Sequence, residues 1–213
     1  MNRFITFEGT EGSGKTTQIA LLADSLRVLG QDVVVTREPG GTPLGEALRT
    51  LLLDGAITIG PVAEAYLMTA ARAEHVHDVI LPALGRGATV LCDRFCDSTL
   101  AYQGGGRGIP VADLREMQRL AIGGAVPDLT ILLTVPVELG LERRTRANDG
   151  NRIDRERLDF HLRVSAAYAA SARADHRRWL VIDATQTADV VHTAVLEGVT
   201  QRLGAGWVAR TVR

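Results

Sequence analysis

The stretch GTEGSGKTT, from Gly9 to Thr17, decides the fold. It holds Lys15, the only lysine of the chain, whereas every other basic residue apart from the histidines is arginine. The stretch fits the pattern G-x-x-x-x-G-K-[ST], follows an apolar run typical of a strand and opens a segment with helical spacing. In that setting, glycine-loop N–H groups and the start of a helix bind phosphate. A chance glycine-rich turn matches the four fixed positions in about one such chain in a hundred or fewer, so the stretch predicts a nucleotide-binding loop.

The lysine in this loop has a chemical reason. Its ammonium group is a compact charge on a flexible stem that reaches the β and γ phosphates, and the planar, bulkier guanidinium of arginine is no equivalent. Thr16 is expected to bind Mg²⁺ through its hydroxyl group. We expect the rest of the loop to contact the nucleotide as well: Gly9, Thr10, Glu11, Gly12, Ser13, Gly14 and Thr17.

Five short apolar runs predict buried strands. They are Phe4–Glu8, Val33–Arg37, Thr89–Asp93, Leu129–Val135 and Leu180–Asp183. The runs are continuous rather than alternating, which is typical of a parallel sheet covered on both faces. The glycine-rich stretches predict loops: Gly40–Gly41, Gly104–Gly108 and Asn148–Asn151.

Segments with helical spacing lie between these strands. The first begins at Lys15 and ends before Gly30, and the others are Pro43–Leu53, Pro61–Leu84, Val111–Ile122, Val137–Arg146, Arg155–Arg173 and Ala188–Leu203. Alternating strands and helices imply right-handed crossovers. The sequence therefore predicts a three-layer α/β fold of the P-loop NTPase type. It has a five-stranded parallel sheet, helices on both faces and a single domain over residues 1–213.

Composition narrows the class of protein. The 213 residues carry a formal net charge of −1, so no overall basic field favours nucleic acid or a membrane surface. No apolar run approaches the roughly 18 residues of a membrane span, and the N-terminus has no secretory signal pattern. Cys92 and Cys96 lie four apart, which matches neither a redox pair nor a metal quartet. These features favour a reducing, cytoplasmic setting.

A phosphate loop alone leaves kinases, GTPases and motor-like ATPases open. The guanine-reading motif N-K-x-D needs a second lysine, so a GTPase of that kind is excluded. The third apolar run ends in Asp93 and Arg94. An acid at the carboxyl end of a parallel strand lies in the ligand crevice. We expect Asp93 to hold the metal, directly or through water, and Arg94 to clamp a phosphate. The alternative is that Asp93 and Arg94 are a purely structural pair on the surface at the end of the strand.

Four motifs, in order along nearly the whole chain, resemble those of the bacterial thymidylate kinases, P-loop nucleoside monophosphate kinases that convert dTMP to dTDP. They are Phe7–Gln18, the TREPGGT segment Thr36–Thr42, the DRF…STLAYQGGGRG segment Asp93–Gly108, and Val181–Gln186. The resemblance implies in-line transfer of the ATP γ-phosphoryl group with Mg²⁺, and a chain that is usually a homodimer. It also implies that Asp183 and Thr185 lie near the adenine of ATP.

The resemblance assigns roles around the acceptor nucleotide. It implies that Glu11 contacts the sugar 3′-hydroxyl, although support of the helix N-terminus is an alternative role. It implies a phosphate site with Arg37 and Arg94, and Arg72 at the thymine edge. The remaining expected acceptor contacts are Pro39, Ser98, Thr99, Tyr102 and Gln103. On spacing alone, Tyr102 would be read as a core residue.

One position departs from the family pattern. The family commonly has a phenylalanine that stacks on the base four residues before the thymine-binding arginine, and this chain has Met68. The spacing keeps Met68 and Arg72 on one helical face. Methionine gives a polarizable contact without aromatic stacking, so we expect looser base selection. Ordinary core packing of Met68 is the alternative.

Arginines crowd the segment around Ala147–Asn151. They are Arg143, Arg144, Arg146, Arg152, Arg155 and Arg157. A solvated, ion-paired surface is one interpretation, and a mobile lid around residues 143–157 that closes over ATP is the other. In one subgroup of the family an arginine follows the acid of the phosphate loop. Here Gly12 stands there, which fits the subgroup with a lid arginine. We expect Arg152 to be catalytic, beside Lys15, Asp93 and Arg94, with Arg146 and Arg143 as the next candidates.

Two other functions remain open at this stage. One is a nucleotide or nucleoside kinase with another base choice. The other is a nucleotide-dependent switch without catalysis, against which the expected acceptor wall argues. A dimer through Pro61–Leu84 is compatible with the pattern, and the tail Gly204–Arg213 has no assigned role.

Overall fold

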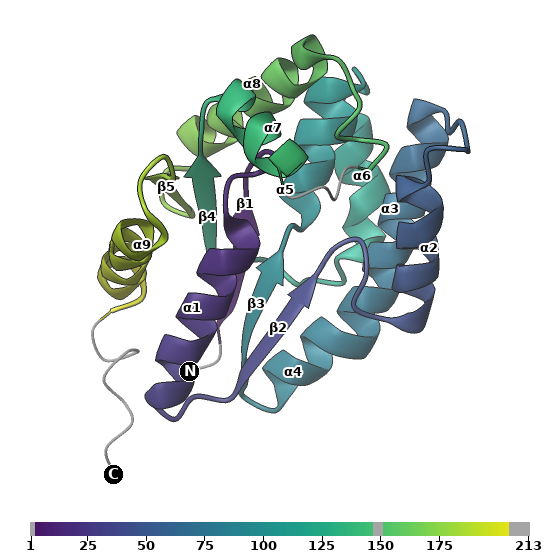
Figure 1. The fold of residues 1–213 in the computed structure, drawn as a ribbon. Helices are drawn as coiled ribbons and strands as arrows, with labels where there is room; N and C mark the ends of the chain where they lie inside the picture. Colours follow the sequence, from purple (N-terminus) through teal and green to yellow (C-terminus); the bar gives the residue numbers. More distant parts are fainter. Residues whose placement is uncertain (1–2, 147–150, 205–213) are drawn as a thin grey trace.

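The computed structural model describes residues 3–146 and 151–204 (Figure 1). Its centre is a parallel sheet of five strands in the order β2-β3-β1-β4-β5. The strands are β1 Phe4–Glu8, β2 Val33–Arg37, β3 Thr89–Asp93, β4 Leu129–Thr134 and β5 Trp179–Asp183. The sequence prediction of a five-stranded parallel sheet is confirmed, and the strand ends differ by a residue only at β4 and β5.

Helices connect the strands and cover the sheet. They are α1 Lys15–Val28, α2 Pro43–Leu53, α3 Pro61–His75, α4 Leu81–Gly85, α5 Cys96–Thr99, α6 Val111–Ala121, α7 Val137–Arg146, α8 Leu158–Ala174 and α9 Ala188–Leu203. Two π-helical segments, η1 Val76–Ile80 and η2 Leu100–Gly106, are inserted between them. The predicted helix Pro61–Leu84 is thus interrupted at η1, just before Pro82, which has no N–H group to donate within a helix.

Alternate residues of β1 face opposite layers. Ile5 and Phe7 pack with residues of α1 and α9, whereas Phe4 packs with residues of η1, α4 and β3 on the other face. Figure 1 shows α1 and α9 on the same side of the sheet. A third cluster joins η2 to α8 and β5. The central strands β1, β3 and β4 are buried on both faces and mainly apolar, as the sequence pattern indicated, whereas the edge strands β2 and β5 are partly exposed.

The prediction of a loop over Gly104–Gly108 is wrong in its first half. Gly104 to Gly106 belong to the helical segment η2. A Cβ atom at Gly105 would overlap Ala167, and one at Gly106 would overlap the ring of Phe160, both in α8. These glycines therefore allow η2 and α8 to pack closely and do not form a turn. The packing outweighs the low helix propensity of glycine.

Candidate active site

The phosphate loop lies between β1 and α1, at the carboxyl edge of the sheet. Gly12 and Gly14 have φ angles of 66° and 87°, in the left-handed region that favours glycine. A Cβ atom at Gly12 would also overlap the backbone of Gly140 in α7. Glycine is therefore required at Gly12 both for the turn and for the approach of α7.

Lys15 curls back over this loop. Its Nζ atom donates to the carbonyl oxygens of Gly9 at 3.1 Å and Thr10 at 3.0 Å, and to Ser13 Oγ at 3.3 Å. The side chain is buried, and burial together with the nearby Arg94 lowers the pKa of Lys15 to about 8. The ammonium group is thus held at the loop, on the wall of the pocket described below.

Thr16 and Asp93 bring two hard oxygen-bearing side chains together at the phosphate loop. Thr16 Oγ1 donates to Asp93 Oδ2 at 3.2 Å, which joins the first turn of α1 to the end of β3. Asp93 Oδ1 is buried and accepts no hydrogen bond from the part of the chain that the structure describes. Among those same residues, no group of three or more His, Cys, Asp and Glu side chains forms a metal cage. This donor set fits Mg²⁺, which keeps waters and takes one or two protein ligands plus phosphate oxygens.

Glu11 lies where the loop meets the end of β3. Its Oε1 accepts hydrogen bonds from Arg94 Nη2 at 3.1 Å and from the Tyr102 hydroxyl at 2.6 Å. Burial alone would raise the pKa of Glu11, but His161, Arg94 and Lys15 outweigh it and bring that pKa to about 2. Arg94 itself has a φ of 70°, a strained conformation for a residue other than glycine. The site therefore holds a permanent carboxylate against a rigid arginine.

Behind Arg94 lies a buried carboxylate that the sequence analysis did not select. Glu8 accepts hydrogen bonds from the backbone N–H of Phe95 at 2.8 Å, from Ser98 Oγ at 2.6 Å and from the Tyr168 hydroxyl at 2.8 Å. Burial raises the pKa of Glu8 to about 7. The signal available in the sequence was its place at the carboxyl end of a strand, the same signal that selected Asp93.

Arg72 is held from several sides. Its Nε donates to Glu38 Oε2 at 2.7 Å, Nη1 donates to Thr99 Oγ1 at 3.0 Å and Gln118 Oε1 at 2.6 Å, and Nη2 donates to the Phe95 carbonyl at 3.1 Å. Its side chain is only 2% exposed. The guanidinium is thus fixed in one orientation. Glu38, which helps to fix it, belongs to the TREPGGT segment but had no expected role, and Gln118 had no local sequence signal.

The expected phosphate residue Arg37 has a neighbour that the sequence analysis also missed. Arg37 Nη2 donates to Glu46 Oε2 at 2.9 Å, and Arg49 Nη1 donates to the Pro39 carbonyl at 3.0 Å. All four residues line the same pocket. Arg49 belongs to no sequence motif, and the one available signal was its place in α2, which begins directly after the TREPGGT segment.

A single pocket of about 1050 Å³ joins these groups. It exceeds the roughly 300–1000 Å³ typical of small-molecule sites. The predicted site residues that line it are Glu11, Gly12, Ser13, Gly14, Lys15, Thr16, Thr17, Arg37, Pro39, Met68, Arg72, Asp93, Arg94, Ser98, Thr99, Tyr102, Gln103 and Arg143. Six predicted residues are not among its lining: Gly9, Thr10, Arg146, Arg152, Asp183 and Thr185. The carbonyl oxygens of Gly9 and Thr10 accept hydrogen bonds from Lys15, which itself lines the pocket.

Arg152 points toward α3 rather than into the pocket. Its Nη2 donates to Glu64 Oε2 at 2.5 Å and its Nε to the Leu52 carbonyl at 2.9 Å. Arg107 and Gln103 donate to the same carboxylate, which is fully buried. The catalytic role of Arg152 stays a prediction, and in this conformation the residue anchors the arginine-rich segment.

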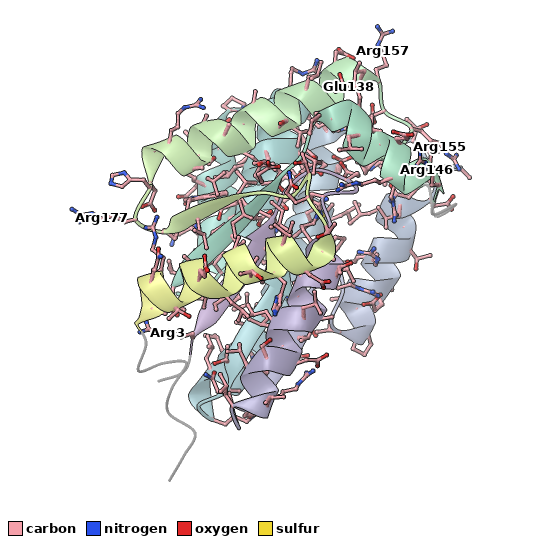
Figure 2. All side chains as sticks on the ribbon, turned by 60° about the vertical axis from the view of Figure 1, so that its left-hand side comes forward. Arg3, Glu138, Arg146, Arg155, Arg157 and Arg177 are labelled. Atoms are coloured by element: carbon pink, nitrogen blue, oxygen red, sulfur yellow. The ribbon has the colours of Figure 1, made fainter. Side chains whose placement is uncertain are left out.

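The other arginines of the segment divide into two groups. Arg143 lines the pocket and donates to the carbonyls of Ala184 at 3.0 Å and Thr185 at 3.2 Å, which links α7 to the end of β5. Arg146 pairs with Glu142, and Figure 2 shows Arg146 and Arg157 at the outside of the molecule. The predicted loop residues Ala147 to Gly150 and the tail from Ala205 lie outside the described residues.

Comparisons with known proteins agree on one family. The family model described as thymidylate kinase matches residues 7–195. A protein of Thermomicrobium roseum named thymidylate kinase is 58% identical over 207 residues, covering 97% of this chain and 98% of that protein. The thymidylate kinase of Caulobacter vibrioides is 49% identical over 202 residues, covering 94% of this chain and 97% of that protein.

The fold agrees as well. The crystal structure of thymidylate kinase from Ehrlichia chaffeensis superimposes with a TM-score of 0.78 at 35% identity, covering 93% of this chain and 98% of that one. Over the described residues, no helix has the length and apolar character needed to cross a membrane. The predicted fold and the resemblance are both confirmed: the chain belongs to the thymidylate kinase family.

Proposed function

We propose that this chain transfers the γ-phosphoryl group of ATP to the 5′-phosphate of dTMP, giving ADP and dTDP for dTTP synthesis. Family membership makes it an ATP-dependent nucleoside monophosphate kinase. The observation that carries the proposal is the continuous pocket, which has the phosphate loop with Lys15 in one part and the wall with Arg72 and Tyr102 in another. A site with both parts suits two nucleotides better than one.

The task of the protein in this reaction is to bring two anions together. A phosphate monoester has a second pKa of about 6, so the acceptor is largely dianionic at neutral pH and is already a nucleophile. No general base is required. Lys15, Arg94, Arg37 and Arg49 surround the pocket with positive charge that offsets the repulsion between the two nucleotides. Their fixed geometry sets the line of attack.

The acceptor would be recognised by groups that the fold already holds in place. Arg72, with most of its N–H groups engaged, presents one defined edge to the thymine. Glu11, ionised at neutral pH, accepts a hydrogen bond from the sugar 3′-hydroxyl. Met68 lines the pocket one helical turn from Arg72 and contacts the base without stacking.

Mg²⁺ is the metal that fits Thr16 and Asp93. Bound with ATP, it would neutralise charge on the β and γ phosphates. Asp93 Oδ1, buried and without a hydrogen-bond donor among the described residues, supports this assignment because it leaves a carboxylate oxygen ready for a ligand.

We assign residues 143–157 the role of a lid that closes over ATP and excludes water. Arg152, the first candidate for the catalytic arginine, would leave Glu64 in the closed state and reach the transferred group. Arg143 already lines the pocket and is the second candidate, and Arg146 is the third.

The assembly and location of the enzyme are further parts of the proposal. Val62 and Tyr66 lie one turn apart on α3 and are 57% and 60% exposed, which suits a homodimer through this helix. Cys92 and Cys96 are free thiols, which suits the cytoplasm.

An acceptor panel tests the proposed function. Initial rates of ADP release are measured with ATP–Mg²⁺ and dTMP, dUMP, dCMP, dGMP or thymidine. We expect dTMP to give the highest kcat/KM and the reaction without acceptor to be slow. A preference for another nucleotide would support the kinase with a different base choice, and equal ADP release without acceptor would support a nucleotide-dependent switch.

A further inference from the structure

A buried histidine faces Glu11 from α8. The side chain of His161 is 1% exposed, and its Nδ1 lies 3.5 Å from Glu11 Oε2, within ion-pair reach but outside hydrogen-bond geometry. Neither ring nitrogen of His161 has a hydrogen-bond partner within residues 3–146 and 151–204, and neither does Glu11 Oε2. A buried polar atom without a hydrogen-bond partner lowers the stability of the fold, so a functional role for these two facing atoms would account for their burial.

The packing of α8 leaves the histidine ring little freedom. Its neighbour Phe160 contacts it edge to face, with ring centroids 5.4 Å apart. Two turns further along the same helix, Tyr168 donates to the buried Glu8. Phe160 and Val164 are buried against η2 and the sheet. The ring therefore cannot turn to solvent, and Glu11 Oε2 is the charged group in front of it.

The two oxygens of Glu11 are held by different elements. Oε1 takes Arg94, which follows β3, and Tyr102 from η2. Lys15 from α1 contributes positive charge at longer range. Oε2 has no hydrogen-bond partner among the described residues, and His161 faces it at 3.5 Å. Without His161, the contacts of Oε1 alone would restrain the turn of the carboxylate about the Cγ–Cδ bond of Glu11.

We propose that His161 is a positioning residue that acts through Glu11. Its Nδ1–H restrains Oε2, so that the carboxylate meets the 3′-hydroxyl of the acceptor sugar in one orientation. His161 is not among the residues that line the pocket, so it acts without touching the nucleotide. This inference rests on the proposed function and on the sugar contact of Glu11, and it adds a residue that sets selectivity for a 3′-hydroxyl.

The test compares acceptors with and without that hydroxyl. The kcat/KM values for dTMP and for 3′-deoxythymidine 5′-monophosphate are measured in the wild type and in three variants. His161→Phe and His161→Leu lack an N–H donor. His161→Asn keeps a donor, because its amide nitrogen lies near the position of Nδ1. We expect the dTMP to 3′-deoxy ratio to fall about tenfold in His161→Phe and His161→Leu, because the charged Glu11 carboxylate loses the N–H group that faces its Oε2. His161→Asn should keep most of the ratio, and the KM for ATP should not change.

Two controls separate this effect from a loss of structure. His192→Phe alters a histidine of α9 that bonds to Ser25, away from the pocket, and should leave the ratio unchanged. Thermal melting identifies any variant that does not fold; His161→Leu decides the question if His161→Phe fails. A double variant with Glu11→Gln and His161→Phe should have nearly the same dTMP to 3′-deoxy ratio as Glu11→Gln alone, because both substitutions remove the same contact.

The inference is overturned if the ratio stays within twofold of the wild type, or if both acceptors lose the same factor in kcat/KM, as a structural defect would cause. Either result in an enzyme that turns over dTMP leaves the proposed function intact. A wild type that does not phosphorylate dTMP refutes the proposed function itself, which the acceptor panel detects separately.

Discussion

Thr16 Oγ1 donates a hydrogen bond to Asp93 Oδ2 at 3.2 Å, across 77 residues of sequence. The bond joins the phosphate loop to the end of β3, and it places a hydroxyl and a carboxylate where the phosphates of a nucleotide would arrive. The same strand end carries Arg94, which bonds to Glu11 on the other side of the loop. Donor and acceptor halves of the site are therefore connected through one strand end.

Asp93→Asn should weaken the use of Mg²⁺ while preserving the fold. The amide keeps the shape of the side chain but removes its charge, so we expect the Mg²⁺ concentration for half-maximal rate to rise at least about tenfold. The measurement is initial rate against Mg²⁺ at fixed ATP. Asp32→Asn, at an exposed ion pair with Arg86, is the matched control. An unchanged Mg²⁺ dependence in Asp93→Asn would remove Asp93 from the metal site.

The affinity for ATP should fall with rising pH above about 8. The pKa of Lys15 is about 8 in the folded protein, against an ordinary value of 10.5, because burial and Arg94 disfavour its charged form. Above that pKa, the free enzyme must take up a proton to bind ATP, so the Kd should rise by up to about tenfold per pH unit until the pKa of Lys15 in the ATP complex is reached. ATP phosphates are fully ionised throughout this range.

Lys15→Met supplies the comparison for that pH dependence. The variant has no ammonium group to titrate, so its weaker ATP binding should not vary in this way between pH 8 and 10. We also expect its kcat to be lower by about 10²- to 10³-fold. Equal pH dependence in the wild type and Lys15→Met would assign the titration to a group other than Lys15.

The buried Glu8 should make stability depend on pH. Burial, with Asp97 nearby, raises its pKa from 4.5 to about 7, and hydrogen bonds and Arg94 oppose this rise only in part. Between these two values the folded state holds more protons than the unfolded state, so the free energy of unfolding falls as pH rises from about 4.5 to about 7. Glu8→Gln, which is neutral at every pH, should lack this fall.

Urea unfolding at pH 5, 6 and 7.5 measures that difference. We expect the wild type to lose stability relative to Glu8→Gln as the pH increases. Parallel curves for the two proteins would show that Glu8 does not titrate in this range. Glu142→Gln, at an exposed pair with Arg146, controls for the loss of a carboxylate.

Arg152 and Glu64 allow a test of the lid. If Arg152 is the catalytic arginine, Arg152→Ala should lower kcat by on the order of 10³-fold. Glu64→Gln, which weakens the contacts with Arg152, Arg107 and Gln103 but keeps all three side chains, should cost far less. If Arg152 serves as an anchor, both variants should show the same modest loss. A fall in kcat of less than about threefold in Arg152→Ala would remove it as the catalytic residue and favour Arg143, which lines the pocket.

Met68→Phe should sharpen base selection. The residue lines the pocket one turn from Arg72, and an aromatic ring there adds about 0.5–1.5 kcal/mol of stacking, or roughly two- to tenfold in KM. The KM for dTMP should therefore fall relative to the KM for dCMP, measured in parallel. The same KM values in both proteins across all nucleotides would show that Met68 does not meet the base.

The strands and the phosphate loop could be predicted because their signals are local. Continuous apolar runs mark strands buried on both faces, and GTEGSGKTT carries its own turn and helix start. The segment η2 could not be predicted, because the fit of its glycines against Phe160 and Ala167 depends on α8, which is far away in sequence.

The predicted and the unpredicted residues of the site differ in whether their contacts are local in sequence. Lys15, Asp93 and Arg94 follow directly from strand ends and from the loop motif. Gln118 contacts Arg72, and Tyr168 contacts Glu8, only once α6 and α8 have packed. The residues next to them in sequence therefore do not predict these contacts. The docking of Arg152 on Glu64 has the same origin.

The central claim is that two nucleotides meet in the pocket and that a phosphoryl group passes between them. Following ³¹P NMR signals of ATP–Mg²⁺ and dTMP with the wild type tests it most directly. The account predicts dTDP and ADP in equal amounts with little inorganic phosphate, and neither product with Lys15→Met over the same time. ADP and inorganic phosphate without dTDP would contradict it.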